Sequence, residues 1–146
     1  MKIFPKKNST IGIISLLVAT ALACERHTKL SIEGGNPPRF VMTGSGSLGS
    51  IRIRGPKRQR EGDGEDALLY WEIRNEKGEA RRVQVLGAVT YGKVPDNYRQ
   101  KYPEHGDASP LIEGERYNIR VTTFNANGAD MYFTIHDGKV VDVSDN

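Results

Sequence analysis

The chain has 146 residues, and its formal net charge of +3 arises from 21 Lys and Arg against 18 Asp and Glu. This length leaves room for one domain, since domains commonly contain about 100–200 residues. Lys2, Lys6 and Lys7 carry the whole excess, because the N-terminal segment that contains them has no acidic residue. The rest of the chain is formally neutral, which argues against a nucleic-acid partner.

The N-terminal segment has the parts of a cleavable signal peptide. Its three lysines precede the uncharged run 11–23, whose length falls within the roughly 7–15 residues of a signal-peptide apolar region. The run is shorter than the roughly 20 apolar residues that a transmembrane helix needs, and no longer apolar run follows it. We therefore predict a signal peptide over residues 1–23.

A lone cysteine follows this run. The sequence Ala21-Leu22-Ala23-Cys24 resembles the lipobox of bacterial lipoproteins, with Ala21 where that family prefers Leu. The resemblance implies that Cys24 becomes a diacylated N-terminus, and two acyl chains suffice for stable anchoring to a membrane. Glu25, rather than Asp, follows the cysteine, which in a Gram-negative host resembles a signal for the outer membrane. We expect a lipid-anchored protein of the bacterial cell envelope, on the outer membrane and facing the periplasm. Ordinary secretion with a free thiol is the alternative.

Residues 24–38 are polar and contain Gly34-Gly35 and Pro37-Pro38. This composition predicts a lipidated N-terminus and a flexible tether. Residues 39–146 would then form the folded domain.

From residue 39 onward, apolar and polar residues alternate with a period of two, which indicates strands. The alternating segments are 39–43, 51–54, 68–74, 82–85, 116–123, 130–135 and 139–143. Turn-rich stretches separate them, and no segment has a helical period. About seven short strands predict an all-β protein with a single antiparallel β-sandwich. Leu69, Trp71 and Ile73 share one strand face, so we expect Trp71 to be buried.

The turn at Asp137-Gly138 predicts a hairpin. A two-residue loop would place Asp142 opposite Phe133, whereas a three-residue bulged turn pairs Phe133 with Val143 and Ile135 with Val141. Because the bulged turn keeps a carboxylate away from the core, we expect that register.

Residues 111–121 resemble the fibronectin type III pattern of a Leu, a Gly turn and Tyr-x-Val-x-Val, here with Tyr117. The resemblance implies a tyrosine corner, in which the Tyr117 hydroxyl bonds to upstream backbone. With Trp71, it implies an immunoglobulin or fibronectin III-like sandwich, but it implies no activity. The segment Tyr91-Gly92-Lys93-Val94-Pro95 is similar to one found in small lipoproteins of bacterial envelopes, and again no activity follows.

Three motifs suggest binding, but each has a simpler explanation. Residues 44–49 match the dinucleotide pattern G-x-G-x-x-G, but a strand follows where the mechanism needs a helix, so we expect an inter-strand loop. Acids over 61–66 loosely resemble a calcium loop, yet Asp66 replaces its glycine, and a solvated turn is the better interpretation. The basic run 57–60 precedes these acids, which would neutralise an anion site there.

Residues 91–110 form the longest irregular segment, and long loops in compact domains are often functional. Tyr and Arg are frequent anchors of protein interfaces. The candidate interface residues in this segment are Tyr98, Arg99, Lys101 and Tyr102. The alternative is that the tyrosines cap the open end of the sandwich.

The histidines, His27, His105 and His136, are not paired in sequence, so we expect no catalytic site, no metal and no cofactor. The leading hypothesis is a non-enzymatic, lipid-anchored binding or structural module whose partners are the membrane and, beyond it, an envelope protein or polymer. The rival is an envelope hydrolase or metal-dependent enzyme with a site assembled from dispersed residues such as Glu104, His105 and Asp107.

Overall fold

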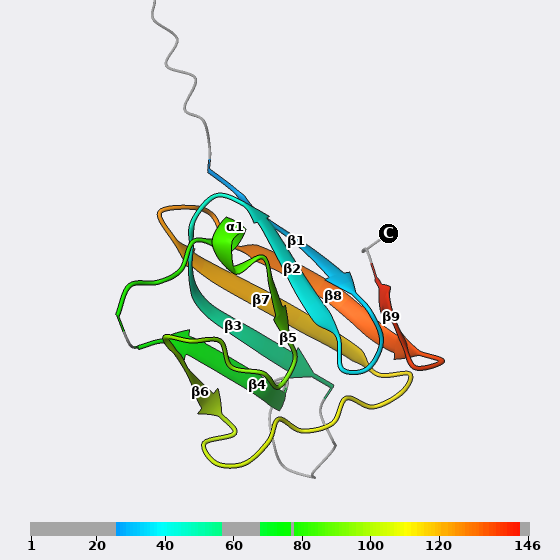
Figure 1. Ribbon diagram of the computed structural model, residues 1–146. Coiled ribbons are helices and arrows are strands. Elements are labelled where there is room, and N and C mark those ends of the chain that lie inside the picture. Colours follow the sequence, from blue (N-terminus) through cyan, green and yellow to red (C-terminus); the bar gives the residue numbers. More distant parts are fainter. Residues whose placement is uncertain (1–25, 57–67, 77, 144–146) are drawn as a thin grey trace, which may run out of the picture.

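The computed structural model describes residues 26–56, 68–76 and 78–143. In this part of the chain nine strands and one short helix form the fold (Figure 1). The strands are β1 (Thr28–Glu33), β2 (Arg39–Gly44), β3 (Ser47–Gly55), β4 (Leu68–Asn75), β5 (Ala88–Thr90), β6 (Tyr98–Tyr102), β7 (Arg116–Phe124), β8 (Ala129–His136) and β9 (Lys139–Asp142). The helix is α1 (Val83–Leu86).

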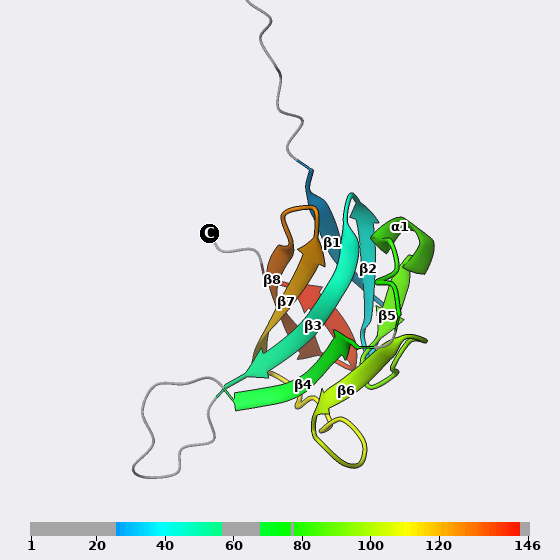
Figure 2. The same cartoon turned by 90° about the vertical axis from the view of Figure 1, so that its left-hand side faces the viewer.

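The strands form two antiparallel sheets that face each other, a small one in the order β1-β2-β5 and a large one in the order β6-β4-β3-β7-β8-β9 (Figure 2). The all-β antiparallel sandwich expected from the alternating pattern is therefore confirmed, with nine strands rather than about seven. Each sheet buries the face that carries its apolar residues and leaves the other face to solvent.

The core lies between the sheets. Phe40, Met42 and Val89 enter it from the small sheet, and Val83 enters it from α1. The large sheet contributes Leu48, Ile51, Ile53, Trp71, Ile73, Tyr117, Ile119, Val121, Phe133 and Ile135. Every residue in this second list alternates with a polar neighbour in sequence or lies beside a bulge, which explains why the period of two located these strands.

Several segments differ from the expectation, among them β5 and β6, which lie outside the predicted strands. Residues 82–85 do not form the expected strand: Arg82 makes an isolated β-bridge with Ser47, and Val83 begins the helical turn α1. Val83 is fully buried, while Val85 points to solvent. Residues 28–33, expected in the tether, form β1, which pairs with β2 over its whole length. The sandwich thus begins within the expected tether, because Thr28, Leu30 and Ile32 turn toward the core while their neighbours face solvent.

Trp71 is buried, as expected, but a β-bulge changes the face of its neighbours. The register shifts between Ile53 and Arg54, which pair with Trp71 and Leu69, so Tyr70 is the extra residue of β4. Tyr70 therefore turns inward beside Trp71, and its ring contacts Tyr117 edge to face with centroids 5.1 Å apart. The indole Nε1 of Trp71 donates a hydrogen bond of 3.0 Å to Gln100.

Tyr117 forms the expected hydrogen bond to upstream backbone. The backbone N–H of Ile112 donates to its hydroxyl at 2.8 Å, and the side chain is fully buried. Burial raises the pKa of the Tyr117 hydroxyl to about 12, and the hydrogen bond from Ile112 partly offsets this rise.

The register expected for the last hairpin is wrong. Phe133 pairs with Asp142 and Ile135 with Val140, so Asp137 and Gly138 form a two-residue turn in which both have positive φ, 50° and 68°. Positive φ at both positions is the type I′ geometry that matches the twist of a hairpin. Asp142 is tolerated opposite the buried Phe133 because β9 is an edge strand, on which the Asp142 side chain stays exposed.

Candidate functional site

The outer face of the large sheet carries a hollow of about 500 Å³ lined by three arginines. We call it the arginine hollow and define it by Arg54, Arg116, Asn118, Arg120 and Tyr132. The strands place these side chains together because β3, β7 and β8 are neighbours, with Arg54 opposite Asn118 and Asn118 opposite Tyr132. All five residues lie at positions that alternate with core residues, so they face outward.

The three arginines have different surroundings. Arg120 donates two hydrogen bonds, of 2.9 Å and 2.7 Å, to one oxygen of Asp130, and Asn118 donates to the other oxygen. The guanidinium of Arg116 lies over the ring of Tyr132, 4.3 Å from its centroid. Arg54 is exposed and makes no hydrogen bond or ion pair within the described part of the chain.

Among the described residues, the outer faces of β3, β4, β7 and β8 carry more arginines than acids. Arg52 lies directly opposite Arg120, an arrangement of like charges that is unfavourable in a sheet unless acids or a ligand compensate it. Glu72 compensates part of it, since Arg52 donates to its carboxylate at 2.8 Å and Arg74 donates at 2.6 Å. Burial by itself raises the pKa of Glu72, but the hydrogen bonds and charges of both arginines outweigh it and hold the pKa below its ordinary value.

Chemically, the arginine hollow suits an anion. Guanidinium groups present pairs of N–H donors that match the oxygens of carboxylate, phosphate and sulfate. Among the described residues, Arg54 has no hydrogen-bond or ion-pair partner, and none of those that line the hollow is acidic. Sequence reasoning missed the site, although its signal was present: two predicted strands each carry two arginines on the face opposite their apolar residues, at 52 and 54 in one and at 116 and 120 in the other.

The four residues of the predicted interface do not form one exposed surface. They lie on β6, an edge strand of the large sheet, instead of in an irregular loop. Arg99 and Lys101 point outward and both pair with Glu76, which lowers the pKa of that carboxyl, mainly through the hydrogen bond from Lys101. Tyr102 is 41% exposed and lines an apolar hollow with Leu68.

Contrary to the predicted interface role, Tyr98 is a core residue, and only 6% of its surface is exposed. Its hydroxyl donates to the carbonyl of Leu48 at 2.7 Å and accepts the N–H of Arg81 at 3.3 Å. These bonds tie β6 to the start of β3 and to the segment before α1. Burial raises the pKa of Tyr98, which fits a structural role.

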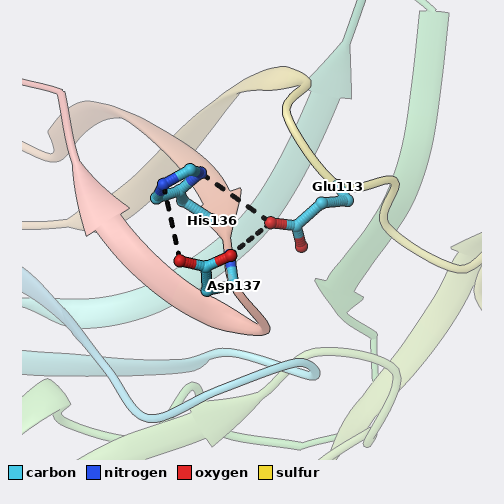
Figure 3. A group of neighbouring side chains, drawn as sticks. All are labelled: Glu113, His136 and Asp137. Carbon is cyan, nitrogen blue, oxygen red and sulfur yellow. Dashed lines mark hydrogen bonds and ion pairs between the residues drawn. The ribbon is translucent and has the colours of Figure 1, made fainter.

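One group of side chains could offer ligands to a metal ion. Glu113, His136 and Asp137 present their oxygen and nitrogen atoms within 4.8 Å of one another at the β8–β9 turn (Figure 3). All three are exposed, and the carboxylate of Glu113 already accepts the backbone N–H groups of Asp137 and Gly138. These bonds explain the position of Glu113 as a brace for a turn whose residues both have positive φ.

The residues named for a dispersed enzyme site, Glu104, His105 and Asp107, do not form such a group in the described ranges. The glycine motif is not the expected inter-strand loop over its whole length, because Gly44 ends β2 and residues 47–49 already belong to β3. As expected, it leads into a strand and not into a helix. Its glycines serve close packing, since a Cβ on Gly44 would lie 2.3 Å from the carbonyl oxygen of His27. The signal peptide, Cys24, the basic run 57–60 and the acids of 61–66 lie outside the described residues.

Comparison with known proteins gives no relative: no family model matches the chain, and no curated protein or solved structure is significantly similar to it. None of the helical structure in the described part has the length and apolarity that a membrane-crossing helix requires.

Proposed function

We propose that this protein is a lipid-anchored, non-enzymatic binding module of the bacterial cell envelope. A diacyl group on Cys24 holds it on the outer membrane, facing the periplasm, and the arginine hollow binds an anionic envelope polymer. The sequence that ends in Cys24 supports the anchor. The observation that carries the binding function is the convergence of Arg54, Arg116 and Arg120 on one hollow of the large sheet.

A polymer is favoured over a small anion by the shape of this face. The arginine hollow is open and continues into the row formed by Arg52, Glu72 and Arg74 on the neighbouring strands. A chain of repeated anionic groups can contact several of these cations at once, and such multivalent contact strengthens binding without a deep pocket.

The test uses the full chain, purified with its lipid from bacterial membranes in a nonionic detergent, and inorganic polyphosphate as the probe. The variant is Arg54→Gln with Arg116→Gln. Its matched control is Lys29→Gln with Arg39→Gln, which removes two exposed charges from the small sheet. Because charge-assisted hydrogen bonds contribute about 1.5–3 kcal/mol each, we expect the hollow variant to bind at least about tenfold more weakly.

The control pair should bind polyphosphate as the wild type does, measured by titration calorimetry at fixed ionic strength. Equal losses in the two variants would show that only net charge matters, and would contradict a site at the arginine hollow. Absence of binding by the wild-type protein would contradict it as well.

A further inference from the structure

Two residues after the cysteine, the backbone is already hydrogen-bonded to the sandwich. The carbonyl of Arg26 accepts the N–H of Asn127 at 2.8 Å, and the carbonyl of His27 accepts the N–H of Ser45 at 2.9 Å. These bonds fix residues 26 and 27 to the β7–β8 and β2–β3 turns. Cys24 lies two residues before Arg26, a separation that extended backbone spans in at most about 7 Å. A lipid on Cys24 would therefore hold this end of the sandwich directly at the membrane.

The same end exposes two large apolar side chains. Phe124, the last residue of β7, is 52% exposed, and Val85 of α1 is 71% exposed. In both views the start of β1, the turns after β2 and β7, and α1 lie together at one end of the sandwich, opposite the β1–β2 and β8–β9 turns (Figures 1 and 2). Phe124 and Val85 line one hollow, so they belong to a single surface.

This surface is also basic. Two adjoining hollows, of about 390 Å³ and 510 Å³, share Arg82 and Phe124. Arg26 lines the first and Arg81 the second, and Glu79 is the acidic one among the described residues that line them. Arg26, Arg81 and Arg82 are exposed, and their guanidinium groups form no ion pair within the described residues.

We propose that this end of the sandwich, defined by Arg26, Arg81, Arg82, Val85 and Phe124 and called here the anchor end, docks on an anionic lipid surface. The inference rests on the proposed lipid at Cys24. Apolar side chains beside arginines are the combination that binds the interface of a membrane, where the rings and methyl groups enter the headgroup region and the cations meet lipid phosphates. Because the link to Cys24 is short, the membrane that the anchor end contacts is the same bilayer that holds the lipid.

Docking gives the protein a defined orientation. The arginine hollow lies on the outer face of the large sheet, toward the end of β3 and the beginning of β7 that lies away from the anchor end. With the anchor end on the bilayer, the arginine hollow is carried away from the lipid headgroups and remains accessible to a polymer. A long flexible tether would leave both surfaces without a fixed direction.

The test reconstitutes the full-length, lipid-modified protein into vesicles of phosphatidylethanolamine and phosphatidylglycerol, with and without brominated acyl chains. Phe124→Trp and, independently, Val85→Trp place a fluorescent reporter at the anchor end. Tyr102→Trp is the matched control, a replacement of another exposed side chain on β6 near the other end. The buried Trp71 gives a background that the unsubstituted protein measures. Melting curves verify that each variant is folded.

We expect brominated lipid to quench the tryptophan at 124 or 85 and to leave the one at 102 unchanged. Adding Arg81→Gln and Arg82→Gln should lower the ratio of docked to undocked protein by roughly fivefold per arginine in vesicles with phosphatidylglycerol. Flotation of the protein together with the vesicles measures the lipid anchor independently of docking.

Protein that floats with the vesicles but shows no quenching at 124 and 85 would overturn the docking and leave the anchor intact. Equal quenching at all three positions would also overturn it, because the domain would then tumble without a preferred face. Protein that fails to float would overturn the anchor and the docking together. If the tryptophans are not quenched and crosslinking shows that the protein self-associates, the surface would instead be assigned to contact with a second copy of the chain.

Discussion

Glu72 shows how single residues stabilise the outer face. Its carboxylate is buried on β4 and is held by Arg52 and Arg74, whose side chains keep part of their surface in solvent. A buried carboxylate is costly unless it is paired, and here the two arginines supply the pairing. Removing the charge would leave Arg52 facing Arg120 with less compensation.

We expect Glu72→Gln to lower the free energy of unfolding at pH 7 by about 1–3 kcal/mol, the cost of disrupting a buried, charged hydrogen bond. Because the pKa of Glu72 is lowered in the fold, its contribution is complete above the ordinary value of about 4.3 and is lost as the pH falls through the folded pKa. Urea unfolding at neutral and acidic pH measures this difference.

The gap between wild type and Glu72→Gln should therefore shrink below about pH 4. Glu33→Gln, at an exposed position of β1, is the control and should change little at any pH. A gap of constant size across this pH range would show that the carboxylate does not act through its ionised form.

Sequence could not predict the burial of Glu72 or of Tyr98. Alternation places Glu72 on the outer face of its strand, and this is correct, but its burial depends on long arginine side chains that cover it. Tyr98 is one aromatic residue in a short polar strand, and its place in the core depends on partners at Leu48 and Arg81, far away in the sequence. Local patterns carry no information about such partners.

At the scale of elements, the bulge between β3 and β4 depends on one glycine. Gly55 pairs with Leu68 where Tyr70 turns inward, and a Cβ built on Gly55 would lie 2.3 Å from the Tyr70 ring and 2.8 Å from the Tyr117 ring. Gly55 has an ordinary backbone conformation, so its role is to provide space. The aromatic pair of Tyr70 and Tyr117 occupies that space.

Gly55→Ala should destabilise the fold by about 1–3 kcal/mol, the usual cost of overpacking a core. The double variant with Tyr70→Leu should lose less than the sum of the two single changes, because the smaller side chain leaves room for the methyl group. Thermal unfolding of the four proteins gives the coupling. Strict additivity would contradict the proposed contact between position 55 and the Tyr70 ring.

Elements were predictable where the apolar alternation was long. β3, β4, β7 and β8 were located from that pattern, and their register places the core. β1 had the same alternation, but its central residues are flanked by a polar segment and by the Gly and Pro residues of a turn. The pair Val83 and Val85 fits a strand as well as a helical turn, and only tertiary packing decides between them.

At the scale of the whole molecule, the two proposed surfaces have different positions on one rigid sandwich. The anchor end adjoins the first described residues, and the arginine hollow lies on the outer face of the large sheet. Sequence predicted the lipid attachment that motivates this arrangement, but neither surface. The arginine hollow needs the strand order β3-β7-β8, and the anchor end needs residue 26, the segment 81–85 and the end of β7 to lie together, so both depend on parts of the chain that are distant in sequence.

The anchor at Cys24 is the claim on which the account depends most. Incorporation of radiolabelled palmitate by growing bacteria, followed by mass spectrometry of the protein's N-terminus, tests it directly. The account predicts a labelled chain that begins at Cys24 and carries a diacylglycerol, and a Cys24→Ser variant that is unlabelled and retains residues 1–23. Label in the Cys24→Ser variant, or a wild-type N-terminus without lipid, would contradict it.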